Sequence, residues 1–259
     1  MTVGAPPFLC DGSLPEGGAT RTVSLRLVGD LEKDTFENDV WTAADQIVTL
    51  FVEAVGNQVF APVDAGRASL VQVSKEWREE GKTWFYLFQV EGLAASAWLC
   101  LVGMLAQSHH ALEPIKSLSF GTQGEGPAVL LPNLLQQPRS SAIRVAAEYP
   151  FTVDFSELDS DQCDILFTFQ RGLDREDFIT IREAIYTWCD IKLLGGYLPG
   201  HDERPGIPQE DMIAHIAPRE IQLQIMMFDL YDWALHGLAN VALAVHRKGF
   251  ELESLILEA

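Results

Sequence analysis

The chain contains one six-residue motif twice, as Leu31-Glu32-Lys33-Asp34-Thr35-Phe36 and, 142 residues later, as Leu173-Asp174-Arg175-Glu176-Asp177-Phe178. Both copies run apolar, acidic, basic, acidic and end in Phe. Each copy follows an alternating apolar segment, which is typical of a strand, and precedes an apolar repeat of helical spacing. A constant interval of this size predicts that one folding module occurs twice in the chain.

A second pair of anchors supports the same prediction. His109 returns as His246, and Ser117-Leu118 returns as Ser254-Leu255, both after 137 residues. The change of interval from 142 to 137 requires a net loss of five residues between the anchors. Loops tolerate deletions of this size, so the two sets of anchors are compatible with one duplication.

The order of elements expected in the first copy identifies a fold class. Apolar spacing predicts strands at 23–27, 69–73, 84–90 and 115–120 and helices over 40–55 and 98–112. Asp34 and Thr35 precede the first helix and are predicted as its N-cap residues. A β-α-β-β-α-β order is that of the ferredoxin-like fold. We therefore predict an α+β protein built from tandem duplicated ferredoxin-like (βαββαβ) units.

Composition divides the chain into four parts. Residues 1–20 contain Pro and Gly without apolar periodicity and are predicted to form a disordered N-terminal tail. Residues 21–120 form the first unit, the Gly- and Pro-rich residues 121–139 a linker, and residues 140–259 the second unit. In the second unit we expect a long loop, residues 195–219, in place of the first unit's tight hairpin. Loops of this length are uncommon in compact domains and are often functional.

Charge restricts the class of partner. The chain has 37 acidic and 18 basic residues, a formal net charge of −19. Such a charge opposes binding to nucleic acid and to anionic membranes and favours basic protein surfaces. No apolar run is long enough to predict a membrane-spanning helix, and residues 1–20 lack the pattern of a signal peptide. Four scattered cysteines without ligand spacing fit a reducing, cytoplasmic compartment.

Familiar catalytic and ligand-binding patterns are missing from the sequence. There is no Gly-x-Ser-x-Gly elbow, and Gly121-x-x-Gly124-x-Gly126 is not followed by the helix start of a phosphate-binding loop. Six potential metal ligands lack the spacing of a zinc-protease helix or a calcium loop: His201, Asp202, Glu203, Glu210, Asp211 and His215. We therefore predict a non-enzymatic protein without a cofactor or a metal site.

Acidic residues gather at two places in the second unit. One set is Asp154, Glu157, Asp159, Asp161 and Asp164, and the other, on the long loop, is Asp202, Glu203, Glu210 and Asp211. Acidic residues at sheet edges also protect against aggregation, which is the alternative interpretation. The functional interpretation is an electrostatic docking surface with Tyr197, Ile207, Met212 and Ile213 as apolar anchors.

Three functions are compatible with these patterns. The first is a non-catalytic, acidic protein-binding module, in its most concrete form a bacterial immunity protein that neutralises a basic toxin or effector. The second is an enzyme or small-molecule binder, haem included, with a pocket between the paired units. The third is a subunit of a larger assembly. Charge and the missing catalytic patterns favour the first.

Overall fold

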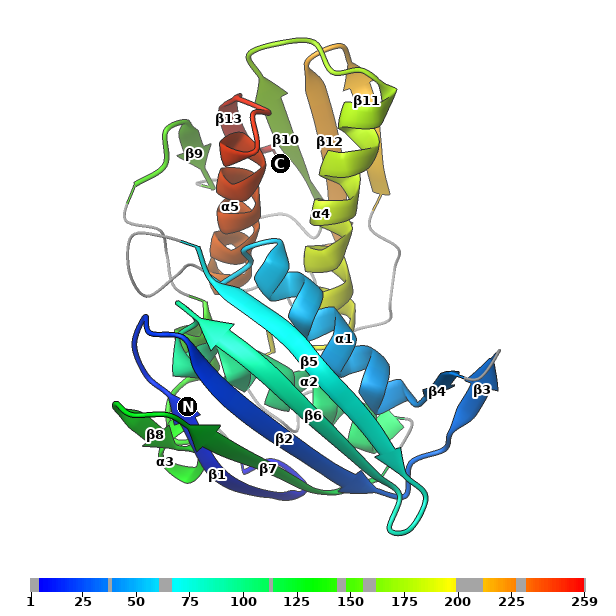
Figure 1. Ribbon diagram of the computed structural model, residues 1–259. Helices are drawn as coiled ribbons and strands as arrows, with labels where there is room; N and C mark the ends of the chain where they lie inside the picture. Colours follow the sequence, from blue (N-terminus) through cyan, green and yellow to red (C-terminus); the bar gives the residue numbers. More distant parts are fainter. Residues whose placement is uncertain are drawn as a thin grey trace.

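The computed structural model describes residues 5–36, 39–60, 67–111, 114–143, 148–155, 162–198, 212–226 and 232–258. In these ranges the chain is an α+β protein with two mixed sheets, of six and five strands, packed with five α-helices (Figure 1). We refer to residues 5–143, which contain the six-stranded sheet, as the first half, and to residues 148–258 as the second half.

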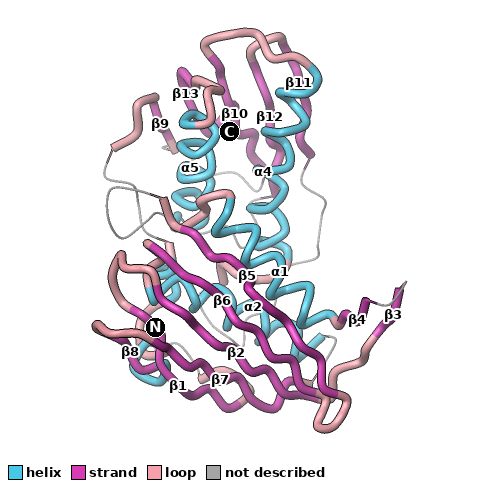
Figure 2. The backbone as a smooth tube through the Cα atoms, in the orientation of Figure 1, coloured by secondary structure: helices cyan, strands magenta, loops and turns pink. Residues whose placement is uncertain are grey.

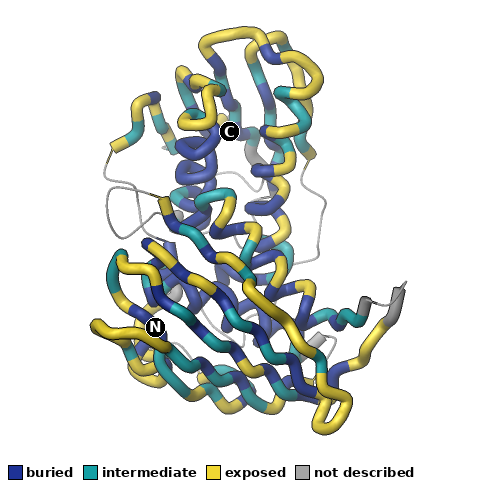
Figure 3. Tube along the Cα trace, viewed as in Figure 1, coloured by how far each residue is buried: buried dark blue, intermediate teal, exposed yellow. Residues whose placement is uncertain are grey.

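The six-stranded sheet carries its helices on one face. Its strands, in spatial order, are β5 (Ser69–Arg78), β6 (Thr83–Glu91), β2 (Arg21–Gly29), β7 (Ile115–Gln123), β1 (Leu9–Pro15) and β8 (Ala128–Leu130). Neighbouring strands are antiparallel except β1 and β7, which are parallel. The helices α1 (Ala43–Gly56) and α2 (Trp98–Ala111) lie behind this sheet in Figure 1. Along β2 and β6, buried positions alternate with more exposed ones, so one face of the sheet packs on the helices (Figure 3).

The five-stranded sheet repeats this arrangement. Its strands, in spatial order, are β11 (Met212–Ala217), β12 (Glu220–Met226), β10 (Gln162–Phe169), β13 (Leu252–Glu258) and β9 (Thr152–Asp154). The first four are antiparallel, and β9 is parallel to β13. The helices α4 (Arg175–Leu193) and α5 (Asp232–Arg247) lie together on one side of the strands (Figure 2). Each sheet therefore has one face covered by two helices and one face turned away from them.

The two halves meet through their helices and share one hydrophobic core. Helix α1 contacts α4 (Figure 1). Across this contact Asn57 Nδ2 donates a hydrogen bond to Thr187 Oγ1 at 2.9 Å. Asn240 Nδ2, on α5, donates to the backbone oxygen of Val59 at 3.0 Å. Buried polar groups require such partners, so these bonds fix how the helices of the two halves pack.

Both halves have the same junction between their second long helix, α2 or α5, and the strand that follows it. At the end of α2, His109 Nδ1 accepts the backbone N–H of Ile115, the first residue of β7, at 3.0 Å. At the end of α5, His246 Nδ1 accepts the N–H of Leu252, the first residue of β13, also at 3.0 Å.

An aromatic ring covers each of these histidines. Phe8 packs against His109 with ring centroids 6.1 Å apart, and Phe151 packs against His246 at 5.6 Å. Phe8 immediately precedes β1, which is parallel to β7, and Phe151 immediately precedes β9, which is parallel to β13. The interval of 137 residues between the histidines thus joins residues with the same contacts.

The repeated motif of the sequence does not fold alike in its two copies. Residues 34–36 form β3 (Asp34–Phe36), which pairs with β4 (Asp39–Trp41), and α1 begins only after Thr42. In the second half Asp174 caps α4 directly. The prediction of Asp34 and Thr35 as N-cap residues is therefore wrong. Residues that favour strands follow Asp34 and close a small hairpin before the helix starts.

Part of the predicted N-terminal tail is a strand. Leu9 to Gly12 pair with β7, and Leu14 is fully buried, so the prediction of disorder is wrong for residues 9–15. Within this strand, Gly12 has a structural role. Gly12 has φ +103°, and a Cβ there would lie 1.8 Å from the backbone oxygen of Phe120. Glycine at this position therefore permits the close approach of two strands.

Two further predicted boundaries change. The predicted linker, residues 121–139, contains the end of β7, strand β8 and the short helix α3 (Leu131–Leu134), whose Leu131 and Leu134 are buried. Within the predicted loop of residues 195–219, β11 starts at Met212 and forms a hairpin with β12. The second half therefore has the hairpin that was expected only in the first. Residues 199–211 lie outside the described part of the chain.

Candidate functional site

Four of the twelve predicted partner-binding residues lie in the described part of the chain: Asp154, Asp164, Tyr197 and Met212. The other eight lie outside it: Glu157, Asp159, Asp161, Asp202, Glu203, Ile207, Glu210 and Asp211. Three of the four described residues share one face of the five-stranded sheet, and the fourth does not.

The alternation of β10 places Asp164 on the face turned away from the helices. Ile165 and Phe167 are buried on the helix side, and Asp164 lies on the opposite side with Leu166. The register aligns Asp164 with Glu258 of β13 and with Gln224 of β12, and Gln224 with Met212 of β11. Asp154 of β9 is aligned with Ile256 of β13, which is aligned with Leu166.

We call this surface the acidic outer face. It comprises Thr152, Asp154, Asp164, Leu166, Thr168, Met212, Ala214, Glu220, Gln222, Gln224, Ser254, Ile256 and Glu258. The five strands of the sheet contain five acidic residues and no Lys or Arg. Four of the five acids, Asp154, Asp164, Glu220 and Glu258, belong to the outer face.

Two features of Asp164 show how the face is built. Gln222 Nε2 donates to its carboxylate at 2.6 Å and Gln224 Nε2 at 3.3 Å, so two neutral amides orient it. On the other side Asp164 lies directly opposite Glu258. Like charges directly opposite each other in a sheet destabilise it by up to about 1 kcal/mol. Stability alone therefore does not favour this pair.

Apolar side chains lie beside these carboxylates. Met212 is 60% exposed and Ile216 is 49% exposed, both on the edge strand β11. On the outer face, Leu166 and Ile256 are partly exposed and next to each other across β10 and β13. Carboxylates and exposed apolar side chains therefore lie side by side on the outer face and on its edge strand.

Tyr197 does not belong to the surface. It is 2% exposed, and its ring packs against Trp188 with centroids 5.7 Å apart. Burial raises the pKa of its hydroxyl well above the usual range, and the neighbouring Cys100 and Cys189 add to this. The prediction of Tyr197 as an exposed anchor is wrong, because Gly195, at φ +71°, ends α4 and turns the chain back into the protein.

Ile213 also points inward. It pairs with Leu223 on the helix side of the sheet and packs partly buried against the core. Of the apolar anchors predicted near β11, only Met212 is therefore placed on the outer face.

The sequence reasoning missed Glu220, Gln222, Gln224 and Glu258. The alternation of residues 220–226 predicts a strand and therefore a polar face. It does not say which strands lie next to it. Only the pairing of β10 with both β12 and β13 brings these residues to Asp164.

A second polar cluster, buried in the first half, is satisfied internally. Asp45, 3% exposed, accepts from the Tyr86 hydroxyl at 2.9 Å and from Lys75 Nζ at 3.1 Å. Thr42 Oγ1 accepts the N–H of Asp45 and the indole N–H of Trp84, both at 3.1 Å. These bonds tie the start of α1 to the sheet, which gives the cluster a structural role.

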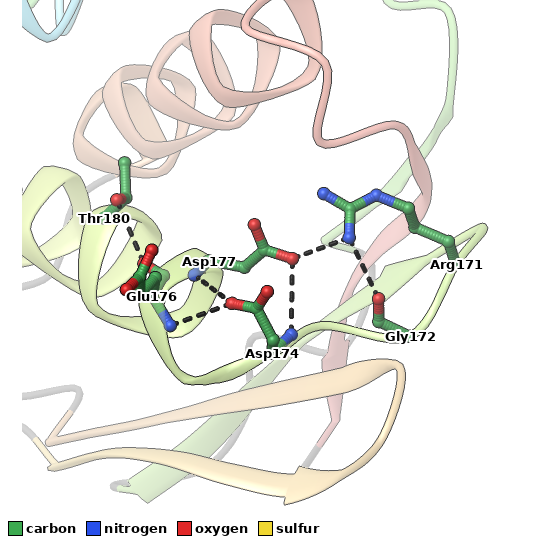
Figure 4. Close-up of polar contacts among 6 residues, drawn as sticks. All are labelled: Arg171, Gly172, Asp174, Glu176, Asp177 and Thr180. Atoms are coloured by element: carbon green, nitrogen blue, oxygen red, sulfur yellow. Dashed lines mark hydrogen bonds and ion pairs between the residues drawn. The ribbon is translucent and has the colours of Figure 1, made fainter.

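The start of α4 carries a comparable network at the surface (Figure 4). The Asp174 side chain accepts the N–H groups of Glu176 and Asp177, and the Asp177 carboxylate accepts the N–H of Asp174. Arg171 donates to Asp177 at 2.6 Å and thereby holds the pKa of that carboxyl below its usual range. This reciprocal pair is a capping box.

Other classes of site find little support in the described ranges. No group of three or more His, Cys, Asp or Glu residues within them is arranged to hold a metal ion. None of the helices in the described part of the chain is both long and apolar enough to cross a membrane. Compared with protein-family models, with curated proteins and with solved structures, the chain matches none of them.

Proposed function

We propose that the chain is a non-catalytic binding protein whose acidic outer face engages a basic surface of another protein. One observation carries the proposal: five neighbouring strands present four carboxylates on one face and contain no Lys or Arg. Lys or Arg side chains of a partner would offset the repulsion between the carboxylates of Asp164 and Glu258. This favourable electrostatic energy would contribute to binding.

The distribution of charge along the chain agrees with this proposal. Residues 151–259 contain 20 acidic and 8 basic residues, and residues 1–150 contain 17 and 10. The formal charge is therefore −12 in the second part and −7 in the longer first part. A field of one sign raises the association rate with a partner of the opposite sign and makes binding sensitive to salt.

We also propose that the two halves descend from one ferredoxin-like unit. In a βαββαβ chain of this class the spatial order is second, third, first and fourth strand. The orders β5-β6-β2-β7 and β11-β12-β10-β13 fit that description. An additional strand parallel to the last one, and the His–Phe junction, recur in both halves. In this proposal only the second unit acquired the acidic outer face.

An immunity protein that neutralises a basic toxin or effector is the concrete form of this function. It accounts for an acidic binding surface in a chain whose sequence lacks catalytic patterns. The test is co-expression with the products of neighbouring genes, because immunity proteins are commonly encoded beside their targets. Binding should weaken as ionic strength rises.

A charge-reversal pair makes this test specific to the surface. Asp164→Lys with Glu258→Lys should abolish retention of the partner at moderate salt. The matched control is Asp11→Lys with Glu91→Lys, which makes the same change in net charge on exposed positions of the six-stranded sheet. Equal retention by both variants, or binding that ignores salt, would refute the proposed function.

A further inference from the structure

We propose that the partner supplies an extended segment that pairs with the free edge of β11 and carries Lys or Arg at alternate positions. This inference rests on the proposed function, since it names the form of the segment that the acidic outer face engages. The addition of a strand to an exposed sheet edge is an established mode of peptide recognition.

No described strand lies along the outer side of β11. In the described part of the chain β11 pairs with β12 alone, at the edge of the five-stranded sheet. Met212, Ala214, His215 and Ile216 are all exposed. An edge strand presents unpaired N–H and C=O groups, and these form a ladder with any extended segment that fits beside them.

Of the edge strands of the two sheets, β11 is the least protected against pairing with another strand. The edge strand β5 carries Lys75, Glu76 and Arg78 and has a register shift between Gln72 and Ser74. The edge strands β8 and β9 have three residues each. Charges, bulges and short length are the usual means of blocking edge pairing. Strand β11, Met-Ile-Ala-His-Ile-Ala, has no charged residue and no Pro. Its register is regular from Met212 to His215 and shifts only near its end, between His215 and Ala217.

Side chains next to this edge specify a basic segment. Alternate side chains of an added strand would lie on the same face as Met212 and Ala214. The next strand inward offers Gln222 and Gln224, whose amide nitrogens are committed to Asp164. Their carbonyl oxygens are then oriented as acceptors for an ammonium or guanidinium group. Glu220, on the same strand and face, adds a carboxylate two strand spacings, about 10 Å, from the added strand.

Charge argues against a second copy of this chain as the occupant. Two copies joined edge to edge through β11 would form one continuous sheet with both acidic outer faces exposed. Neither β11 would contribute a cation, and each chain has a net charge of −19. The negative potential of the chain attracts a cationic segment, whereas it repels a second copy of the same chain.

The experiment uses two peptides with the full-length chain. The first alternates Lys and Val over nine residues, and the second has the same sequence with every Val N-methylated, which removes N–H groups but keeps the charge. We expect the first peptide to bind at least tenfold more tightly and to slow amide hydrogen exchange in β11. Met212→Lys with Ala214→Lys should weaken this binding at least tenfold. Val71→Lys with Val73→Lys, on the exposed edge of the other sheet, should leave it within about twofold.

The outcomes separate this inference from the proposed function. If both peptides bind equally and Asp164→Lys with Glu258→Lys abolishes both, the acidic outer face binds cations without strand addition, and this inference fails alone. If neither peptide binds at low salt while the protein partner is still retained through the acidic outer face, the inference again fails alone. If neither peptide binds and Asp164→Lys with Glu258→Lys also leaves retention of the protein partner unchanged, both proposals fail.

Discussion

The two halves of the molecule resemble each other on the inside and differ on the outside. Facing the helices, both sheets present buried apolar residues, and both end with a histidine that binds the first amide of the last strand. Facing away, the six-stranded sheet has Arg26 and Arg78 against the ring of Phe85, with Glu76 paired to Arg78. The five-stranded sheet has carboxylates and amides there and no basic residue. Packing against the helices restricts which side chains the inner face can carry. The outer face has no such restriction, so its side chains can differ between the two halves.

The largest expected effect tests whether the halves are separable at all. Trp188 is fully buried, donates its indole N–H to the backbone oxygen of Ala234 at 2.7 Å and packs against Tyr197. Trp188→Ala should lower the free energy of unfolding by about 3–5 kcal/mol. Because the helices of both halves share one core, urea unfolding should remain one transition, and hydrogen exchange should accelerate in both halves together.

A matched substitution in the first half sharpens this result. Trp98 is also fully buried, but its indole N–H has no hydrogen-bond partner among the described residues. Trp98→Phe should therefore cost less than Trp188→Phe, which removes the hydrogen bond from the indole N–H to the Ala234 carbonyl. Two separate unfolding transitions, with Trp188→Ala shifting only one of them, would show that the halves fold independently.

The next effect tests the strongest similarity between the halves. His109→Leu and His246→Leu each leave one backbone N–H at the start of a strand without its acceptor. Each should cost about 2 kcal/mol, since an unpaired buried donor costs about 1–3 kcal/mol. Asn at either position offers an amide oxygen as acceptor and should recover part of the loss. Equal costs from thermal or urea unfolding would support a common origin, and a cost at one site only would argue against it.

The sequence was informative where the apolar spacing of a single strand or helix was the signal. Alternation in residues 23–27 and helical spacing in residues 40–55 correspond to β2 and α1. The 137-residue interval joined His109 to His246, which have the same contacts. The 142-residue interval misled, because six similar residues close a hairpin at Asp34–Phe36 and start a helix at Arg175. Local similarity does not determine structure where a neighbouring segment, here β4, competes for the same residues.

The candidate site required information that a single sequence lacks. The excess of acid in the second half was visible and selected Asp154 and Asp164, and Met212 was selected as an apolar anchor beside the acidic residues. Glu220 and Glu258 are 38 residues apart and are brought to one face by strand pairing alone. Tyr197 was misplaced because a Gly-rich segment suggested a loop on the surface. Gly195 instead turns the chain toward Gln107 and Trp188 in the core.

The smallest expected change in stability concerns the N-terminal cap of the first long helix in each half. Thr42 caps α1 with a hydroxyl, whereas Asp174 and Asp177 cap α4 with carboxylates. The pKa of Asp177 is lowered by its hydrogen bond from Arg171, so its contribution to stability is present at neutral pH and is lost as pH falls through that lowered value. Asp177→Asn should therefore be less stable than the parent at pH 7, and the difference should vanish in acid. Thermal unfolding measured across a range of pH tests this prediction, with amide exchange at Glu176 as the local probe.

A difference in stability that persists at low pH would mean that Asp177 acts through packing, because a protonated carboxyl is no longer stabilised by Arg171 or by the dipole of α4.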